Sequence, residues 1–327
     1  MKRFFLLLAV VGMLFTACSE VGTNEQPTQT EPEYVTVSLG LNVGLDYGYQ
    51  PLSRAEENND LYGIQVYSTP VPAAENAEWT KYAYGLFDTT DNLTIKLIRG
   101  YEYKFVARMV KDGKDKVSQW SDGSYGFPFH HTDENGNGDY TPLSTSFIYS
   151  LLGMIFLGGS DSEYHNAESY YGELEGYIPG DNDSKATIEL KRTSFGVKYI
   201  AKGDFAENGT LEILMTDAPQ LNLNLAEGNE ISEIYTFKNV RTAWLDENYT
   251  ETIAVTLRIA YSDGSTAPLG THNITFKRNT TTVVNVDLSV GGENGVGFVV
   301  TEDGEMPEGD EITIKDGEIV DTEIETN

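Results

Sequence analysis

Apolar and polar residues alternate with a period of two along much of the chain. The pattern is clearest at residues 34–43 (YVTVSLGLNV), where Val35, Val37 and Leu39 are each followed by a polar residue or glycine. Successive side chains of a strand point to opposite faces of a sheet, so this alternation indicates strands with one buried face. We predict further strands at residues 61–68, 92–98, 101–110, 186–192, 195–203, 210–216, 231–240, 252–262, 272–278 and 281–290.

Turn signals separate these segments. Gly100, Gly113, Gly209 and Gly264 each follow an arginine, aspartate or asparagine, which is a common turn composition. No segment shows the apolar spacing of an amphipathic helix over three turns. Many short strands at short spacing are typical of antiparallel sandwiches rather than of parallel sheets with crossover helices. We therefore predict an all-β chain with two antiparallel β-sandwich domains (transthyretin-like or immunoglobulin-like) in tandem.

A polar break at residues 181–185 (DNDSK) precedes the densest run of predicted strands. Polar stretches of this kind often connect domains. We therefore place an N-terminal sandwich at residues 34–184 and a C-terminal sandwich at residues 185–327.

The first residues follow a different pattern. Lys2 and Arg3 precede an uninterrupted apolar run at residues 4–15. This run is too short to cross a bilayer, which takes about 20 apolar residues, but it has the length of a secretory signal. We predict that residues 1–17 are a signal peptide that is removed on export.

Cys18 is the only cysteine of the chain and follows Phe15, Thr16 and Ala17. This arrangement is similar to a bacterial lipobox, in which small residues precede the cysteine that receives the lipid, although Phe15 replaces the usual leucine. The similarity implies that Cys18 is acylated, for example with palmitate, in an outer-membrane lipoprotein. Each buried acyl methylene contributes about 0.8 kcal/mol to membrane binding. The alternative is an ordinary signal peptide with an incidental cysteine.

The polar residues 19–33 have no apolar periodicity, so we predict a flexible tether there. The formal net charge of the chain is −29, and loss of the signal peptide leaves 51 acids against 20 bases, a net charge of −31. A surface this acidic repels phosphate, so nucleic acid is not an expected partner. Anionic lipid head groups are disfavoured for the same reason.

One segment contains half of a calcium-loop pattern. Asp133, Asn135, Asn137 and Asp139 supply oxygen atoms at alternate positions, with glycines between them, as in the pattern D-x-[DN]-x-[DN]-G. The acid expected at the twelfth position is replaced by Ser144. These four residues are candidate calcium ligands. The alternative is a hairpin tip rich in glycine and asparagine.

No enzyme signature is present. The four histidines do not form an H-E-x-x-H motif, and acylation of Cys18 would remove the only thiol nucleophile. Neighbouring His130 and His131 point to opposite faces of an extended chain, which makes them a poor chelate. We do not expect an enzyme.

Aromatic residues suggest a different activity, stacking on sugar rings in an anchored glycan-binding lipoprotein. Tryptophan and tyrosine also fill strand positions routinely, and packing in the core or at a sheet edge is the more common role. The candidates are Trp79, Tyr82, Tyr84, Trp120, Tyr125, Tyr170, Tyr171 and Trp244. The longest later apolar run, residues 147–157, is too short to span a membrane, and we expect it to be buried core.

Three stretches of the chain together resemble a known family. The first comprises the lipobox, the tether and a first strand that runs into Leu52, Ser53, Arg54 and Ala55. The second is residues 186–199, a strand ending in two basic residues before another strand begins. The third is residues 274–288, where a basic turn joins two strands. With these features the chain resembles the fimbrillin-like (FimA-like and Mfa-like) lipoproteins of Bacteroidetes.

The resemblance implies assembly by strand exchange. In that family a protease cuts after an arginine that follows the first strand, and a strand from a neighbouring subunit fills the vacated groove, which satisfies its unpaired backbone groups. Here Arg54 and Ala55 would flank the cut, residues 34–45 would be the removable strand, and residues 310–324 the candidate donor. Alternatively, Arg54 is an ordinary loop residue, the tail folds back as an edge strand, or the subunit stays anchored and uncut.

We therefore predict a structural or adhesive subunit, or an anchor or tip component, of a fimbria-like surface assembly. Other pilin-like subunits would be its partners through strand exchange, and the lipid would attach it to the outer membrane. A glycan or a host surface is a further candidate partner. A glycan-binding lipoprotein is the alternative function.

Overall fold

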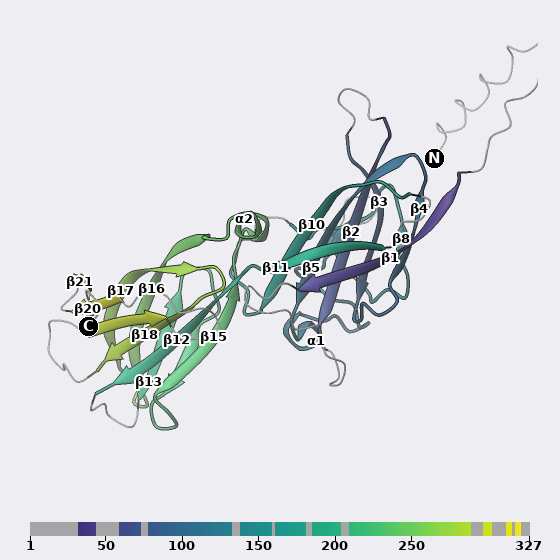
Figure 1. Ribbon diagram of the computed structural model, residues 1–327. Helices are drawn as coiled ribbons and strands as arrows, with labels where there is room; N and C mark the ends of the chain where they lie inside the picture. The colour runs from purple at the N-terminus through teal and green to yellow at the C-terminus, as the bar shows by residue number, and fades with distance from the viewer. Residues whose placement is uncertain are drawn as a thin grey trace, which may run out of the picture. The chain divides into compact units, whose positions relative to one another are not determined.

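The computed structural model describes residues 32–43, 59–72, 78–132, 138–158, 161–180, 185–203, 209–288, 297–302, 312–315 and 318–321. From Tyr34 onward these residues belong to one compact unit. Strands dominate the described part, as Figure 1 shows. The helices there are α1 (Gly113–Lys116) and α2 (Val240–Leu245). The predicted all-β class is confirmed.

The first part of the chain forms an eight-stranded sheet in the order β4-β1-β11-β10-β5-β2-β3-β8. β10 and β11 are joined in register by only two residue pairs, Tyr170↔Arg192 and Tyr171↔Lys191. Strands from both halves of the sheet contribute to one buried core, as in a sandwich. The strands are β1 (Tyr34–Val43), β2 (Leu61–Pro70), β3 (Thr80–Phe87), β4 (Thr94–Ile98), β5 (Tyr101–Val110), β8 (Ile148–Tyr149), β10 (Ser169–Tyr177) and β11 (Lys185–Arg192).

A small sheet lies in the long connection between β5 and β10. Its strands, in the order β7-β6-β9, are β6 (His131–Thr132), β7 (Gly138–Asp139) and β9 (Met154–Ile155). Phe129 and Ile155 from this connection join Leu61 and Tyr171 in a second buried cluster. The connection therefore packs onto the outside of the first sheet.

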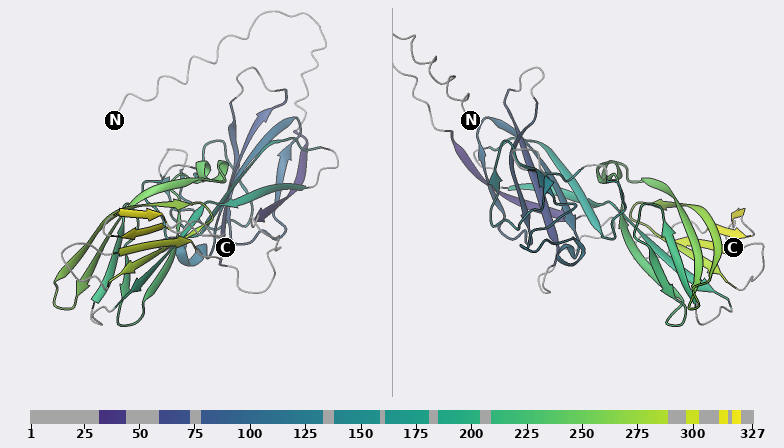
Figure 2. Two further views of the ribbon diagram at one scale, coloured as in Figure 1. Left: turned by 60° about the vertical axis from the view of Figure 1, so that its left-hand side comes forward. Right: turned by 180° about the vertical axis from the view of Figure 1, so that it is seen from behind.

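Two further sheets enclose a third buried cluster in the second part of the chain (Figure 2). Phe195, Leu211 and Phe276 are among its buried side chains. The six-stranded sheet contains, in order, β15 (Glu230–Thr236), β12 (Ser194–Lys202), β18 (Thr281–Asp287), β19 (Gly297–Glu302), β20 (Ile312–Lys315) and β21 (Glu318–Asp321). The four-stranded sheet contains β14 (Leu221–Asn224), β13 (Gly209–Met215), β16 (Thr250–Tyr261) and β17 (Thr266–Lys277).

Most strand pairs are antiparallel, as predicted, but two are parallel. β1 pairs with β11, and β12 pairs with β18. Both parallel pairs join segments far apart in the sequence. Two of the predicted turns have the expected geometry, since Gly100 between β4 and β5 and Gly264 between β16 and β17 adopt φ values of 79° and 85°, which glycine tolerates best.

The predicted position of the domain boundary needs correction. β11 begins at Lys185, yet it pairs with β1 and β10 in the first sheet. A boundary between residues 184 and 185 would remove this strand from its sheet. The first strand of the second part, β12, begins at Ser194, so a boundary at Thr193 fits the pairing. The division into two domains itself stays a prediction.

The expected burial of residues 147–157 is only half correct. Phe147, Ile155 and Leu157 are buried, whereas Leu151 and Leu152 are 72% and 56% exposed. Hydrophobicity alone does not show which way a side chain faces, so the prediction fails for the middle of the run. Its central residues instead form an exposed apolar turn.

Candidate functional site

β1 lies inside the first sheet, between β4 and β11 (Figure 1). Its first half pairs antiparallel with β4, from Tyr34↔Ile98 to Ser38↔Thr94. Its second half pairs parallel with β11, from Ser38↔Lys185 to Val43↔Leu190. The two halves of β1 therefore bind different strands and overlap at Ser38. Removal of β1 would expose unpaired backbone on both neighbours.

The side chains of β1 alternate between the core and the surface, as the sequence predicts. Val37 is 0% exposed and Leu39 is 4% exposed, and both belong to the first core. Val35 and Leu41 pack against that core and are partly buried. Complete burial of one such side chain contributes about 1.5–3 kcal/mol. The β1 slot, which we define as the space between β4 and β11 that β1 fills, is thus shaped for a strand with apolar residues at every second position.

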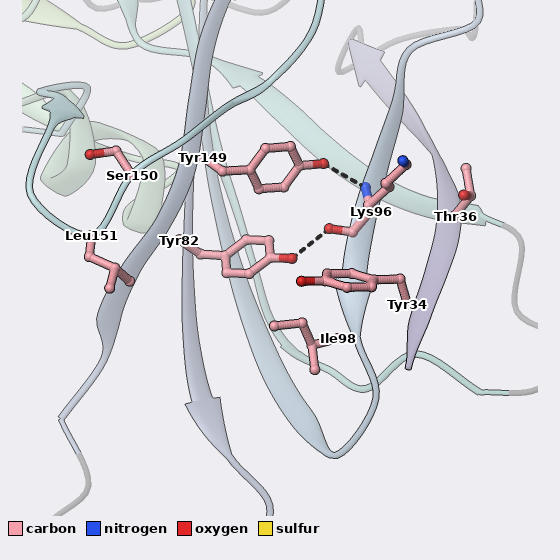
Figure 3. A pocket seen from close by; sticks show the side chains of 8 residues that line it. All are labelled: Tyr34, Thr36, Tyr82, Lys96, Ile98, Tyr149, Ser150 and Leu151. Carbon is pink, nitrogen blue, oxygen red and sulfur yellow. Dashed lines mark hydrogen bonds between the residues drawn. The ribbon is translucent and has the colours of Figure 1, made fainter. Parts of the chain in front are cut away.

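β4 is the end strand of the sheet, and its outer edge is covered by tyrosine hydroxyls (Figure 3). The backbone N–H of Lys96 donates to Tyr149 Oη at 2.9 Å, and Tyr82 Oη donates to the Lys96 carbonyl at 2.6 Å. The N–H of Ile98 donates to Tyr103 Oη at 2.7 Å, and this oxygen also lies 3.1 Å from the Ile98 carbonyl. We call Tyr82, Tyr103 and Tyr149 the tyrosine clasp.

The tyrosine clasp closes an edge that could otherwise pair with another chain. An unpaired strand edge is a template for further strands, and folded proteins protect such edges in several ways. Here phenol groups take the positions that the backbone of an added strand would occupy. Burial raises the pKa of Tyr103 to about 12, and burial also raises the pKa values of Tyr82 and Tyr149. All three hydroxyls therefore stay protonated at neutral pH.

A pocket of about 490 Å³ opens beside the tyrosine clasp. Tyr34 and Tyr149 are 56% and 50% exposed, so both residues are accessible from solvent. The lining is formed by Tyr34, Thr36, Tyr82, Lys96, Ile98, Tyr149, Ser150 and Leu151.

Glu173 on β10 is a second polar centre of the first sheet. Its carboxylate accepts hydrogen bonds from Arg241 Nε at 2.6 Å and from Tyr171 Oη at 2.6 Å, and it pairs with Lys104 Nζ at 3.0 Å. Burial alone would raise the pKa of Glu173, but these three partners outweigh it and lower the pKa to about 2. All the strong partners of this carboxylate lie within the protein, which indicates a stabilising role.

Several predicted site residues lie outside the described residues. These are Cys18, Arg54 and Ala55, so lipidation and proteolytic processing stay predictions. Arg54 falls in residues 44–58, between β1 and β2 along the chain. No helix in the described ranges is long and apolar enough to cross a membrane.

The calcium prediction is untested for the same reason. Asp133, Asn135 and Asn137 lie outside the described residues, and Asp139 ends β7, where its backbone pairs with His131. Among the residues that are described, no group of three or more His, Cys, Asp or Glu side chains is arranged to hold a metal ion.

The C-terminal tail follows one of the alternatives considered for it. β20 pairs with β19, and β21 pairs with β20, so the tail extends a sheet of its own chain. Donation to a neighbouring subunit would require this hairpin to leave that edge.

The aromatic residues considered for sugar binding divide into two groups. Most are buried or partly buried, and Trp244 packs edge-on against Tyr171 with ring centroids 5.7 Å apart. Trp120 is 58% exposed and lies 5.2 Å from the Tyr140 ring. The five buried candidates are Tyr82, Tyr84, Tyr125, Tyr170 and Tyr171.

The tyrosine clasp was not predicted. Tyr82 was considered only for stacking, and Tyr103 and Tyr149 were not singled out. The available signal was the total of 20 tyrosines, which is high but does not show which hydroxyl reaches which strand edge.

No protein-family model matches the chain, and no curated protein matches it. Among solved structures, it is similar to a proposed cell adhesion protein from Bacteroides eggerthii, with a TM-score of 0.39 and 11% identity over 83% of this chain and 96% of that one. It is also similar to a fimbrial assembly protein from Parabacteroides distasonis, with a TM-score of 0.38 and 12% identity over 85% and 98%. The fimbrial anchor protein of Porphyromonas gingivalis matches with a TM-score of 0.39 and 8% identity over 85% and 99%.

At such identities and TM-scores the likeness carries no information about ligands, partners or residue roles. The functional argument for this chain therefore depends on its own residues.

Proposed function

We propose that this chain is a lipid-anchored structural or adhesive subunit of a fimbria-like surface assembly, and that it exchanges strands at the β1 slot. The observation that carries the proposal is the position of β1. It is the first described strand, it lies inside a sheet, and only one of its faces enters the core. A strand with these properties can be replaced by another strand of the same pattern.

The surroundings of β1 support this assignment. Loss of β1 would leave unpaired backbone on β4 and β11 and an apolar groove where Val37 and Leu39 had been. The outer edge of β4 is already satisfied by the tyrosine clasp. Strand addition to this end of the sheet is thereby directed to the β1 slot.

The pattern of β1 defines what a donor strand must offer. Residues 35, 37, 39 and 41 supply four alternating apolar side chains. In the C-terminal tail, Ile312 and Ile314 on β20 supply two. The tail of a neighbouring copy would therefore satisfy half of the pattern, and a donor from another subunit could satisfy all of it.

Processing at Arg54 would decide between two roles. A cut there would release β1 together with Cys18, leaving a subunit that is free to accept a donor. An uncut chain would keep its lipid and its own β1 and would act as an outer-membrane anchor. Both roles belong to the proposal.

Limited proteolysis tests the exchange step. The full chain is treated with an arginine-specific protease, and a fluorescent peptide with the sequence of residues 34–43 is added in excess. We expect cleavage between Arg54 and Ala55 and uptake of the peptide. In a parallel sample without the peptide, we expect the cut chain to form oligomers that survive size-exclusion chromatography. Arg54→Ala provides the uncut control.

A second peptide tests whether uptake into the β1 slot depends on the apolar pattern. It carries aspartate at the positions of Val37 and Leu39, and we expect it to be excluded, because a carboxylate would enter the core without a partner. A chain that is cut at Arg54 but takes up neither peptide and stays monomeric contradicts the proposal. Equal uptake of both peptides would contradict it too.

A further inference from the structure

Four large apolar side chains are exposed together at one corner of the first sheet. Tyr34, Tyr149, Leu151 and Leu152 are 56%, 50%, 72% and 56% exposed. The first three line the same pocket (Figure 3), and Leu152 follows directly in the chain. We call these four residues the apolar rim.

The turn that carries the two leucines is held in place by hydrogen bonds. Ser150 Oγ accepts the backbone N–H groups of Leu152 at 3.2 Å and Gly153 at 2.8 Å. Lys81 Nζ donates to the Leu152 carbonyl at 2.8 Å. The leucines are therefore presented by an ordered turn while their side chains face solvent.

The composition of the apolar rim suits a membrane surface. Exposed apolar clusters mark interaction sites, and tyrosine is enriched where proteins meet the boundary between lipid head groups and acyl chains. Leucines on the same face can enter that boundary. Lys81 and Lys96 lie beside the rim and supply positive charge there.

The length of the tether limits how far this corner can lie from the predicted anchor. Tyr34 follows Cys18 by 16 residues, so the chain between them spans at most about 55 Å. An anchored protein meets the bilayer at a high effective concentration, and a weak contact is then sufficient for docking.

We propose that the apolar rim docks on the bilayer that holds Cys18, with Leu151 and Leu152 at the boundary between head groups and acyl chains. This inference depends on the lipid anchor of the proposed function. Because Tyr34 belongs both to the rim and to β1, docking also holds the N-terminal end of β1 in the sheet. Membrane docking and strand exchange therefore oppose each other.

The test uses the lipidated full chain in vesicles of phosphatidylcholine, whose neutral surface avoids repulsion by the acidic protein. With Cys18 acylated, Leu151→Cys introduces the only reactive thiol, which is labelled with an environment-sensitive fluorophore. Leu245→Cys is the matched control, because Leu245 on α2 is similarly exposed at 61%. We expect spin-labelled lipids to quench the label at position 151 at least about threefold more strongly than the label at position 245.

A second variant separates docking from tethering. Adding Leu152→Asp to the Leu151→Cys protein should reduce the quenching to the level of the position 245 control, since a carboxylate resists transfer into the head-group boundary. Unchanged quenching in this variant would show that the tether alone brings the corner to the membrane, which overturns the proposal.

The remaining outcomes are also distinct. A protein that stays on the vesicles while position 151 is not quenched overturns docking but leaves the anchor intact. A protein that is not retained on the vesicles overturns the anchor itself and docking with it. A blue shift at position 151 that depends on protein concentration, without lipid quenching, assigns the rim to a contact between copies instead.

Discussion

β1 and β18 occupy similar positions in the two parts of the chain but are buried differently. Each lies inside its sheet and has one parallel neighbour, β11 for β1 and β12 for β18. β1 exposes Thr36 and Ser38 and buries Val37 and Leu39. In β18, by contrast, every residue from position 282 to position 286 is buried.

This difference in burial indicates which of the two strands can be exchanged. A strand that is buried on one face needs only an alternating apolar pattern, because its other face tolerates any polar side chain. A strand that is buried on both faces must fit its surroundings at every position, including the polar side chain of Asn285. β1 is therefore replaceable, whereas β18 is an integral part of its core.

The largest expected effect separates the two strands directly. Val284→Asp places a carboxylate in the second core, where Val284 is 0% exposed, and we expect a loss of at least about 4 kcal/mol in unfolding free energy. Leu39→Asp should instead release β1 and leave the second core folded. Thermal unfolding, combined with the rate of cleavage after Arg54, distinguishes these results. Equal loss of both cores in the two variants would contradict the comparison.

The next largest effect is expected at Glu173 on β10, in a part of the first sheet that does not include β1. Because the pKa of Glu173 is lowered to about 2, its stabilising contribution is complete above the ordinary pKa of about 4.5 and is lost as the pH falls toward 2. We expect Glu173→Gln to cost on the order of 2 kcal/mol at pH 7. Urea unfolding should show the variant and the wild type converging near pH 2. A difference that is independent of pH would show that charge is not the cause.

Gly196 and Gly40 allow the tightness of the two parallel strand contacts to be compared. A Cβ atom at Gly196 on β12 would lie 2.5 Å from Thr281 Oγ1 and 3.3 Å from Thr281 Cα, whereas one at Gly40 on β1 would meet the flexible end of Lys185 at 3.1 Å. We expect Gly196→Ala to cost about 1–3 kcal/mol and Gly40→Ala to change stability by less than about 0.5 kcal/mol. Similar costs in denaturant unfolding would mean that both slots are equally tight.

At the edge of β4 we expect a smaller effect than at Gly196. Tyr82→Phe removes the hydroxyl that donates to the Lys96 carbonyl, and a hydrogen bond of this kind contributes about 0.5–1.5 kcal/mol. We also expect the opened edge to increase self-association at high protein concentration, measured by analytical ultracentrifugation. Tyr140→Phe is a control away from the clasp. A Tyr82→Phe protein that stays monomeric would show that the tyrosine clasp does not protect this edge.

Many strands were predictable from the sequence because one of their faces is buried and the other is more exposed. The predicted segment at residues 186–192 matches β11 (Lys185–Arg192), whose burial alternates along the strand, and the start of β1 at Tyr34 was also predicted. β3 (Thr80–Phe87) was missed, since all of its residues from position 82 to position 87 are buried and no alternation appears. β10 was missed for a related reason, because the consecutive residues Tyr170 and Tyr171 are both buried.

The candidate site was predictable only in part. The removable strand came from alternation and family resemblance, but its neighbours β4 and β11 are set by long-range pairing, which a local pattern does not contain. The tyrosine clasp forms only because the hydroxyl groups of tyrosines on three different strands meet at the same edge of β4. The prediction of buried core at residues 147–157 is wrong for Leu151 and Leu152, because these two differ from buried leucines only in the direction they face.

The divided pairing of β1 has a mechanical consequence. A pull on the chain before Tyr34 acts along the axis of β1, while its backbone hydrogen bonds to β4 and β11 run across that axis. Bonds across the direction of pull are loaded together rather than opened one by one. Because β4 holds one half of β1 and β11 the other, the load is shared by both neighbours. We therefore expect β1 to resist tension well, although a competing strand can still displace it stepwise from one end.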